Sequence, residues 1–236
     1  AKLDYAGSAE LPYAYPGLFL TPEKQELING LSDPALRETM KDYFLNTAFR
    51  KDVFVRGARR MSAPRQAEWL SQVGMALIVP RADVSLSMKL VVGEVNAREE
   101  VYGPVLDALA RQPHTLAELV ALPALQGQGL GNLAQIAAIL TASGQAAFYF
   151  ASNGKVATDS ALRMNRMLAA NVRYGDEYQA LSSPVLGNGL SSNFIERVVY
   201  LVLGQNVRDP DLAQVVKGAW QVMASQGRRM IKDGKL

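Results

Sequence analysis

The stretch Gly127-Gln128-Gly129-Leu130-Gly131 has the residue types that come closest to a nucleotide-binding loop. In dinucleotide and S-adenosylmethionine folds, such glycines directly follow a buried parallel strand, so that the backbone approaches the ligand closely. Here a short predicted helix and Pro123 precede the glycines, and no acidic residue follows at the end of a second strand. The pattern therefore favours a flexible connection between helices over a cofactor site.

The side chains available for acid–base, nucleophilic or metal chemistry are few. The chain has no cysteine and one histidine, His114, which removes thiolate nucleophiles, disulfides, Cys-rich zinc sites and any site that needs two imidazoles. A carboxylate site for magnesium or calcium stays open, but we find no Asp-rich loop to build one. A Ser-His-Asp relay would have to use His114, which we expect to be an exposed loop residue. We therefore predict no catalytic residue, no metal site and no cofactor in this chain.

Positive charge is concentrated in one short stretch, although the net charge of +3 and the pI near 9.1 are mild. Six basic residues stand there against the single acid Asp52: Arg50, Lys51, Arg56, Arg59, Arg60 and Arg65. The stretch is either a surface for phosphate or an acidic partner, or a solvated face of helix and strand. If Val53–Val55 is a strand, the six basic residues need not point to the same side of the molecule. This favours the second interpretation, in which they are simply solvated.

Length and composition indicate a globular protein with one or two cores. The chain has 236 residues, of which 49% are hydrophobic and 20% are charged. The longest apolar run, Val198–Leu203, is far shorter than the roughly 20 residues of a membrane span, and no signal segment opens the chain. It begins with Ala1 rather than Met, which favours a segment of a longer or processed protein. We expect a cytoplasmic protein that does not contact a membrane.

The order of the predicted elements indicates an α+β fold with three regions. Residues 1–98 begin with an extended arm, 11–22, followed by helices 22–31 and 35–49. Residues 53–55, 75–79 and 86–95 read as strands of one small antiparallel sheet with helices on one face. We expect this α+β domain to end near residue 98.

Residues 99–160 are predicted to form a winged-helix-like domain. Three helices, 101–111, 116–122 and 132–142, precede a hairpin of 146–151 with 155–158 that turns at Asn153-Gly154. Nucleic-acid binding is therefore an alternative function, because the third helix of such a domain lies in the major groove. Helix 132–142 has no cationic side chain, however, so we expect a protein-packing module. Residues 161–236 form a C-terminal helical region with a polar loop over 174–189.

Two stretches carry a resemblance to a known family. Phe44–Arg56, preceded by Leu31-Ser32-Asp33-Pro34, is similar to the predicted methyltransferase regulatory domain family. Asn165-Arg166 and Leu181–Gly189 resemble the region that follows that domain. In this family an S-adenosylmethionine-dependent methyltransferase domain precedes the regulatory segment, and some members resemble bacterial protein-lysine methyltransferases.

The resemblance implies a non-catalytic regulatory or substrate-presenting region of a methyltransferase, acting through protein–protein contacts. Its partner would be the methyltransferase domain of the same polypeptide, where S-adenosylmethionine would bind, and a protein substrate is a further partner. The candidate interface residues are Asn46, Arg50, Arg56, Ser183, Pro184, Gly187 and Gly189. The choice of Asn46, Arg50 and Arg56 assumes that their polar side chains have no role within the chain. In the alternative, Asn46 ends a helix and Arg50 pairs internally.

Overall fold

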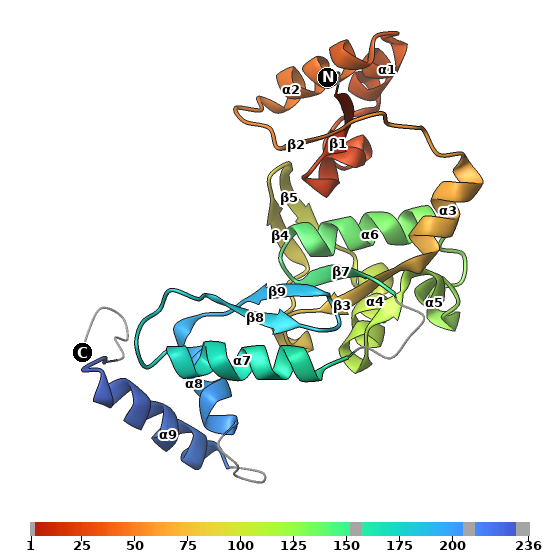
Figure 1. The fold of residues 1–236 in the computed structure, drawn as a ribbon. Helices are drawn as coiled ribbons and strands as arrows, with labels where there is room; N and C mark the ends of the chain where they lie inside the picture. The colour runs from red at the N-terminus through yellow and green to blue at the C-terminus, as the bar shows by residue number, and fades with distance from the viewer. Residues whose placement is uncertain (1–2, 152–156, 205–210, 230–236) are drawn as a thin grey trace. The chain divides into compact units, whose positions relative to one another are not determined.

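The computed structural model describes residues 3–151, 157–204 and 211–229, which form an α+β fold (Figure 1). The chain divides into two compact units, residues 1–151 and 152–236. Strand pairing among the described residues is antiparallel and occurs in small separate sheets, so the predicted α+β class is confirmed. The boundaries expected after residues 98 and 160 stay predictions.

The first unit opens with what we call the amino-terminal segment, residues 3–61. Its elements are β1 (Asp4–Ser8), η1 (Leu11–Ala14), η2 (Pro16–Leu18), α1 (Pro22–Gly30), α2 (Pro34–Leu45) and β2 (Asp52–Val55). The arm expected over 11–22 is not extended, because Pro12 and Pro16 begin two 3-10 helices there. β1 and β2 form a two-stranded antiparallel ribbon with an irregularity between Tyr5 and Gly7.

Prolines begin the two helices of the amino-terminal segment, and a side-chain cap supports the second. Pro22 and Pro34 are the first residues of α1 and α2, and the Asp33 carboxylate accepts a hydrogen bond from the Ala35 N–H at 2.7 Å. α2 ends at Leu45, four residues before the predicted end at residue 49. It stops there because Asn46 adopts a left-handed backbone, with φ of 51°, and so terminates the helix.

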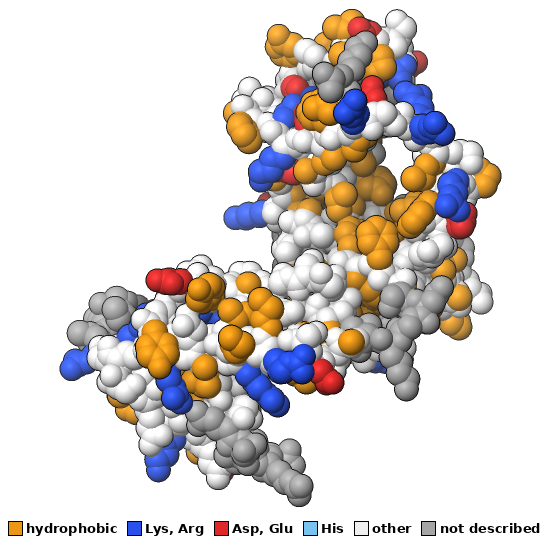
Figure 2. Space-filling view, in the orientation of Figure 1, with side chains coloured by type: hydrophobic (Ala, Val, Ile, Leu, Met, Phe, Trp, Pro, Cys, Tyr) orange, Lys and Arg blue, Asp and Glu red, His pale blue; other side chains and the backbone are white. Residues whose placement is uncertain are grey.

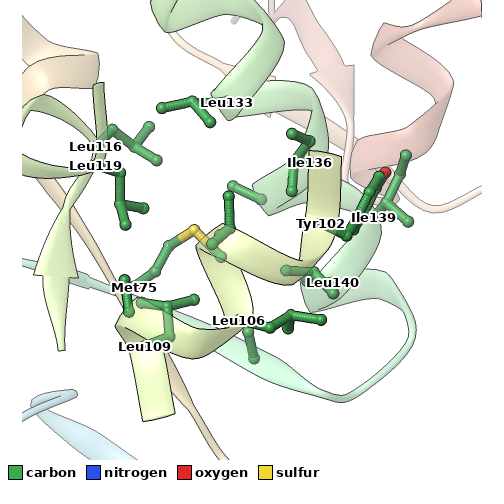
Figure 3. Close-up of a cluster of buried hydrophobic side chains, with 14 of the residues drawn as sticks. Met75, Tyr102, Leu106, Leu109, Leu116, Leu119, Leu133, Ile136, Ile139 and Leu140 are labelled. Carbon is green, nitrogen blue, oxygen red and sulfur yellow. The ribbon is translucent and has the colours of Figure 1, made fainter. Parts of the chain in front are cut away.

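The rest of the first unit, residues 63–151, is called the body. Its elements are α3 (Ala63–Gln72), β3 (Val73–Leu77), η3 (Arg81–Asp83), β4 (Ser87–Leu90), β5 (Gly93–Asn96), α4 (Glu99–Arg111), β6 (His114–Thr115), α5 (Leu116–Val120), η4 (Pro123–Leu125), α6 (Leu130–Ala142) and β7 (Ala146–Phe150). One cluster of buried apolar side chains, drawn from β3, α4, α5 and α6, forms its core (Figure 3).

Helical periodicity explains which side chains enter this core. In α4, the buried residues Tyr102, Val105, Leu106 and Leu109 recur at three- and four-residue spacing, so they form one stripe along the helix. α6 differs, because between Leu133 and Leu140 every residue except Gln135 is buried. A helix that is apolar on all sides must be covered on all sides, and α6 is covered by α3, α5, β7 and η1.

The strands of the first unit do not form the single sheet predicted from the sequence. β2 pairs with β1, whereas β3 is the central strand of a second sheet in the order β6-β3-β7. The strand predicted over 86–95 is the hairpin β4–β5, in which Leu90 pairs with Gly93. Val91 and Val92 at the turn gave the stretch a continuous β-branched pattern, but Gly93, with φ of 122°, allows the chain to reverse.

The predicted hairpin of 146–151 with 155–158 is also replaced by another pairing. β7 pairs along its length with β3, from Val73 with Phe150 to Leu77 with Ala146. Residues 157 and 158 are not in a strand, and residues 152–156 lie outside the described part of the chain. Gly74 permits this pairing, because a Cβ atom on it would lie 2.2 Å from the Tyr149 ring.

The described residues of the second unit form three helices and one hairpin. Its elements are α7 (Asp159–Asn171), β8 (Ala180–Ser183), β9 (Asn188–Ser191), α8 (Phe194–Leu203) and α9 (Leu212–Ser225). α8 contacts both α7 and α9. The polar loop predicted over 174–189 contains most of the β8–β9 hairpin, whose turn is formed by residues 184–187. The C-terminal helices expected from the sequence are thus present, together with a hairpin that was not expected.

Candidate functional site

His114 does not lie in an exposed loop, as the sequence had suggested. It pairs with Met75 in the sheet as part of β6, and its side chain is 14% exposed. Its Nδ1 atom lies 3.6 Å from Glu118 Oε2, too far for a hydrogen bond. Glu118 instead accepts from the Thr115 N–H at 2.7 Å, as part of the capping box that begins α5. Thr115 and Glu118, the neighbours of His114, thus cap the start of α5.

The described residues offer neither a group of metal ligands nor a membrane-spanning helix. Within residues 3–151, 157–204 and 211–229, no three side chains of the His, Cys, Asp and Glu types are grouped so as to hold a metal ion. Nor does any helix of the described residues have the length and apolar character needed to cross a bilayer.

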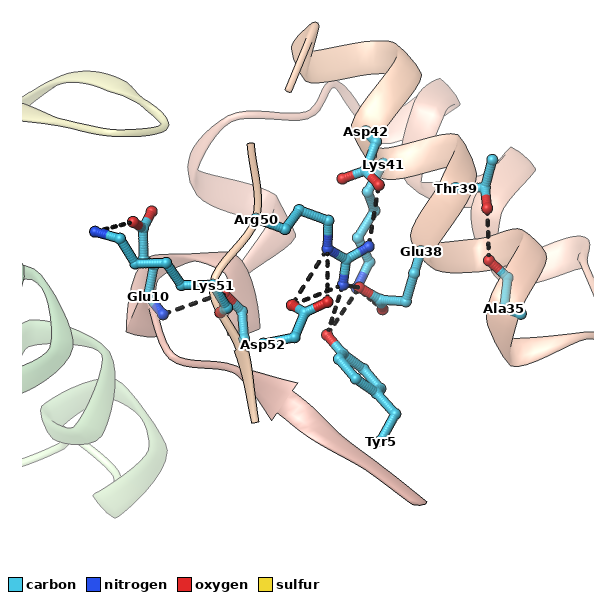
Figure 4. Close-up of polar contacts among 11 residues, drawn as sticks. Tyr5, Glu10, Ala35, Glu38, Thr39, Lys41, Asp42, Arg50, Lys51 and Asp52 are labelled. Carbon is cyan, nitrogen blue, oxygen red and sulfur yellow. Dashed lines mark hydrogen bonds and ion pairs between the residues drawn. The ribbon is translucent and has the colours of Figure 1, made fainter. Parts of the chain in front are cut away.

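A cluster of polar side chains surrounds Arg50, in the amino-terminal segment (Figure 4). The Arg50 guanidinium donates to Asp42 Oδ2 at 3.0 Å, to Asp52 Oδ1 at 3.1 Å and to Glu38 Oε2 at 3.2 Å. It also donates to the Tyr5 hydroxyl at 3.0 Å and lies over the Tyr5 ring. Arg50 therefore fastens together α2, β1 and β2, and we call these five residues the Arg50 cluster.

The cluster shifts the pKa values of Glu38, Tyr5 and Arg50. Burial alone would raise the pKa of Glu38, but hydrogen bonds and charges from Lys41, Tyr5 and Arg50 outweigh burial and lower it. Burial and the Glu38 carboxylate raise the pKa of the Tyr5 hydroxyl to about 12. Burial would lower the pKa of Arg50, yet hydrogen bonds and charges from Asp42 and Asp52 raise it. The cluster thus favours a charged Glu38, a charged Arg50 and a neutral Tyr5.

Two open hollows flank the amino-terminal segment. One, of about 320 Å³, is lined by Tyr5, Arg37, Glu38 and Lys41 together with residues of η2, α1 and the start of α2. The other, of about 330 Å³, lies between residues 9–13, Lys51, the β4–β5 turn and the end of α6. Their linings include charged side chains, Glu38 and Lys41 in the first and Glu10 and Lys51 in the second.

The structure assigns internal roles to two of the candidate interface residues. The Asn46 backbone terminates α2, and the Arg50 side chain is the hub of the Arg50 cluster, so the assumption that Arg50 has no role within the chain is wrong. Arg56 differs, because it is exposed at the turn after β2. An interface role of all three stays a prediction.

The other candidates lie on the β8–β9 hairpin of the second unit. Ser183 ends β8 and its hydroxyl accepts from the Leu186 N–H at 3.3 Å; Gly187 has φ of 66° at the turn; Gly189 pairs with Ser182. Pro184 follows Ser183 in the same turn. These residues shape the hairpin, and their interface role is likewise untested. The structure gathers the seven candidates into two groups, one in each unit.

Sequence reasoning missed several residues that the structure shows to be central. Glu38 and Asp42 are four residues apart on α2, a spacing that places both carboxylates on one helix face and would have indicated a shared cation. In the second unit, the buried Asn165 amide donates to the Ser182 carbonyl at 2.9 Å and accepts from the Ser182 N–H at 2.6 Å. The Arg197 side chain is 1% exposed and pairs with Asp176. No local pattern signals these long-range pairs.

The amino-terminal segment matches the model of a known family. Residues 1–56 match the family model described as "Predicted methyltransferase regulatory domain". These residues contain every member of the Arg50 cluster and the ribbon β1–β2. The resemblance seen in the sequence around Phe44–Arg56 is therefore confirmed.

Two longer proteins are similar to the whole chain. "Uncharacterized protein sll1526" of Synechocystis sp. is 34% identical over 241 residues, covering 100% of this chain and 46% of that protein. The solved structure described as "The structure of PKMT2 from Rickettsia typhi" superposes with a TM-score of 0.50 at 13% identity, covering 99% of this chain and 50% of that one. At this identity the likeness shows the fold alone. The chain spans about half the length of both relatives.

Proposed function

Because residues 1–56 belong to the predicted methyltransferase regulatory domain family, we propose that the chain is the accessory region of an S-adenosylmethionine-dependent methyltransferase. It regulates the methyltransferase domain or presents a protein substrate to it, through protein–protein contacts, and does not itself transfer methyl groups. Its partner domain lies in the same polypeptide, which is bacterial and cytoplasmic. The family match is the observation that carries this proposal.

The geometry of the amino-terminal segment supports a binding role. The Arg50 cluster uses charged hydrogen bonds to fix α2 against the β1–β2 ribbon, so the segment presents one conformation to a partner. Surfaces that are ordered before binding lose less entropy on association. Arg56, at the end of the ribbon, has a planar set of donors suited to carboxylates and lies exposed.

The experiment for this function uses the full-length polypeptide and measures methyl transfer together with thermal unfolding. We expect Arg56→Glu to lower methyl transfer without changing the melting temperature, because Arg56 is exposed. Arg50→Glu should lower the melting temperature, because it places a fourth carboxylate among Glu38, Asp42 and Asp52. Methyl transfer that is unchanged by Arg56→Glu, and unchanged also when residues 1–56 are deleted, would refute the regulatory role.

The cofactor is proposed to bind outside this chain. Calorimetry of the isolated chain with S-adenosylmethionine should therefore give no binding heat. One-to-one binding with a micromolar dissociation constant would instead place a cofactor site here.

A nucleic-acid-binding winged helix is the alternative that we considered from the sequence. The order α4, β6, α5, α6, β7 follows that of a winged helix, with β3 in the place of the wing's second strand. Such a domain reads DNA with the exposed face of its third helix. α6 is buried through its middle turns and covered by η1 and α3, so we assign it to protein packing. A gel-shift series across salt should show only weak, sequence-independent binding; selective submicromolar binding lost on substitution of Gln135 would contradict this.

A further inference from the structure

We propose that the β1–β2 ribbon and the loop after it, residues 56–61, dock on the methyltransferase domain of the same polypeptide. The docking surface on that domain is an apolar strip bordered by carboxylates. This inference rests on the proposed function and adds to it which face of the segment makes the contact. We call residues 56–61 the arginine loop.

The first observation is the exposure of the ribbon. Val53, Phe54 and Val55 are consecutive in β2, so their side chains point alternately to the two faces of the ribbon. All three are exposed, and Phe54, which is 52% exposed, contacts the Tyr5 ring edge to face. Leu3, just before β1, and Tyr5, within β1, are also exposed. Among the described residues, much of this apolar surface thus stays open, although Arg50 lies over the Tyr5 ring.

An apolar ribbon of this kind is unusual unless something covers it. A two-stranded sheet is only marginally stable in water, and an exposed hydrophobic strand invites pairing with other chains. Contiguous apolar patches on a protein surface generally mark interaction sites. Figure 2 shows apolar side chains among Lys and Arg side chains over the amino-terminal segment. The ribbon is thus best explained as one half of an interface.

The second observation is the charge beside the ribbon. Between Asp52 and Glu68 the sequence has no acidic residue, and the arginine loop contains Arg56, Arg59 and Arg60. All three are exposed. Arginine pairs with carboxylates through two parallel hydrogen bonds, so the loop fits an acidic border on its partner.

The third observation is that the loop is fixed to the ribbon. The Asp4 carboxylate accepts a hydrogen bond from the Ala58 N–H at 3.2 Å, which ties the arginine loop to β1. At the other end of the ribbon, the Arg50 cluster ties β1 and β2 to α2. The apolar side chains of the ribbon and the arginines of the loop therefore lie next to each other on one surface.

The apolar side chains and the arginines together indicate which kind of molecule docks on this surface. A phosphate backbone would satisfy the arginines but offers nothing apolar to the ribbon, whereas a protein surface satisfies both. Both relatives are about twice as long as this chain, so each has a further half that is available to supply that surface. Under the proposed function that further half contains the methyltransferase domain, which makes this domain the occupant.

Photo-cross-linking in the full-length protein tests the inference directly. A benzoylphenylalanine residue in place of Phe54 should cross-link to peptides of the methyltransferase domain, near Asp or Glu residues. The same probe in place of Tyr43, which is 78% exposed on α2, is the matched control and should not reach that site. Absence of cross-links from Phe54 to that domain, or equal yields from both positions, would overturn the inference.

Charge reversal tests the arginine loop. Arg59→Glu with Arg60→Glu should lower the Phe54 cross-link several-fold, as should high ionic strength. Arg163→Glu with Arg166→Glu, an exposed pair on α7, should leave it unchanged. An unchanged cross-link in the Arg59 and Arg60 variant would overturn the inference.

The methyl-transfer assay separates this inference from the proposed function. Loss of activity on deletion of residues 1–56, without a Phe54 cross-link, would overturn the docking surface and leave the regulatory role intact. A Phe54 cross-link combined with unchanged activity after the deletion would support the docking surface and refute the regulatory role.

Discussion

The amino-terminal segment and the body of the first unit are stabilised by different means. The body contains the main core cluster, with seventeen buried residues from Met75 to Ala146. In the segment, only Pro12, Leu20 and Ile28 are buried. Its elements are joined instead by the Arg50 cluster, a set of charged hydrogen bonds at half-buried side chains.

This difference indicates which region depends more on other contacts. The body buries a large apolar cluster, although Val91 and Phe150 stay exposed. The segment buries few apolar side chains and exposes others, among them Tyr43, Phe49 and Phe54. Burial of apolar area is the main stabilising term of folding, so a region that buries little depends on other contacts. Within the chain these contacts are ionic, and in the longer polypeptide we expect a partner surface to add the apolar ones.

The largest effect should come from the body core. Leu140→Ala removes a fully buried side chain and should lower the free energy of unfolding of the first unit by about 3 kcal/mol. Urea denaturation monitored by circular dichroism measures this. The control Leu27→Ala, at a residue exposed on α1, should cost about half a kcal/mol or less. Equal effects at the two sites would contradict the comparison.

The second effect concerns the segment alone. Arg50→Met should cost about 1–3 kcal/mol, because it leaves Glu38, Asp42 and Asp52 without their shared cation. Limited proteolysis should then cut residues 3–61 faster, while cleavage of the body stays unchanged. Arg56→Met is the matched control and should change neither. An equal acceleration in the body would show that the two regions unfold together.

A smaller effect should appear on acidification. The pKa of Glu38 is lower in the folded chain than its ordinary value of 4.5, so the folded state prefers the ionised carboxylate. Its stabilisation is present above pH 4.5 and is lost as the pH falls through the lowered pKa. Urea midpoints measured from pH 6 to pH 3 should therefore fall, and less so in Glu38→Gln. A steeper fall in the variant would contradict this sign.

The smallest effect should be at the ribbon. Phe54→Ser in this chain should change the free energy of unfolding by about half a kcal/mol or less, because the side chain is already exposed. In the full-length protein the same change should destabilise more, if the ribbon is covered there. Thermal unfolding of both forms makes the comparison, and equal shifts would count against a covered ribbon.

Local signals in the sequence predicted many of the helices. Pro22, Pro34 and Thr115 begin helices for reasons that lie within three residues of each, and the structure agrees. Strand partners were not predictable in this way. The partner of β3 is β7, far along the chain, and nothing in the alternation of either strand specifies the other. Pairing depends on how the helices between them pack.

The candidate site was predicted only in part, for a similar reason. Arg50 was identified from the resemblance, but its partners were not. Glu38 and Asp42 could have been found from their spacing on one helix face, whereas Tyr5 reaches Arg50 across an irregular strand pair that no sequence pattern reveals. The family resemblance pointed to the segment that contains Arg50, because a resemblance between two sequences can be recognised without knowing which side chains contact each other.

The central position of β3 has a consequence for how the body folds. β3 precedes α4, α5 and α6 in the chain, yet its partner β7 follows all of them, so the sheet can close only after the three helices are in place. Contacts between such distant residues slow folding, because the chain loses loop entropy before the pairs form. During synthesis on the ribosome, the apolar strand Val73–Leu77 therefore emerges well before its partner. A chaperone that shields short apolar strands should bind the nascent chain here, until Ala146–Phe150 has been made.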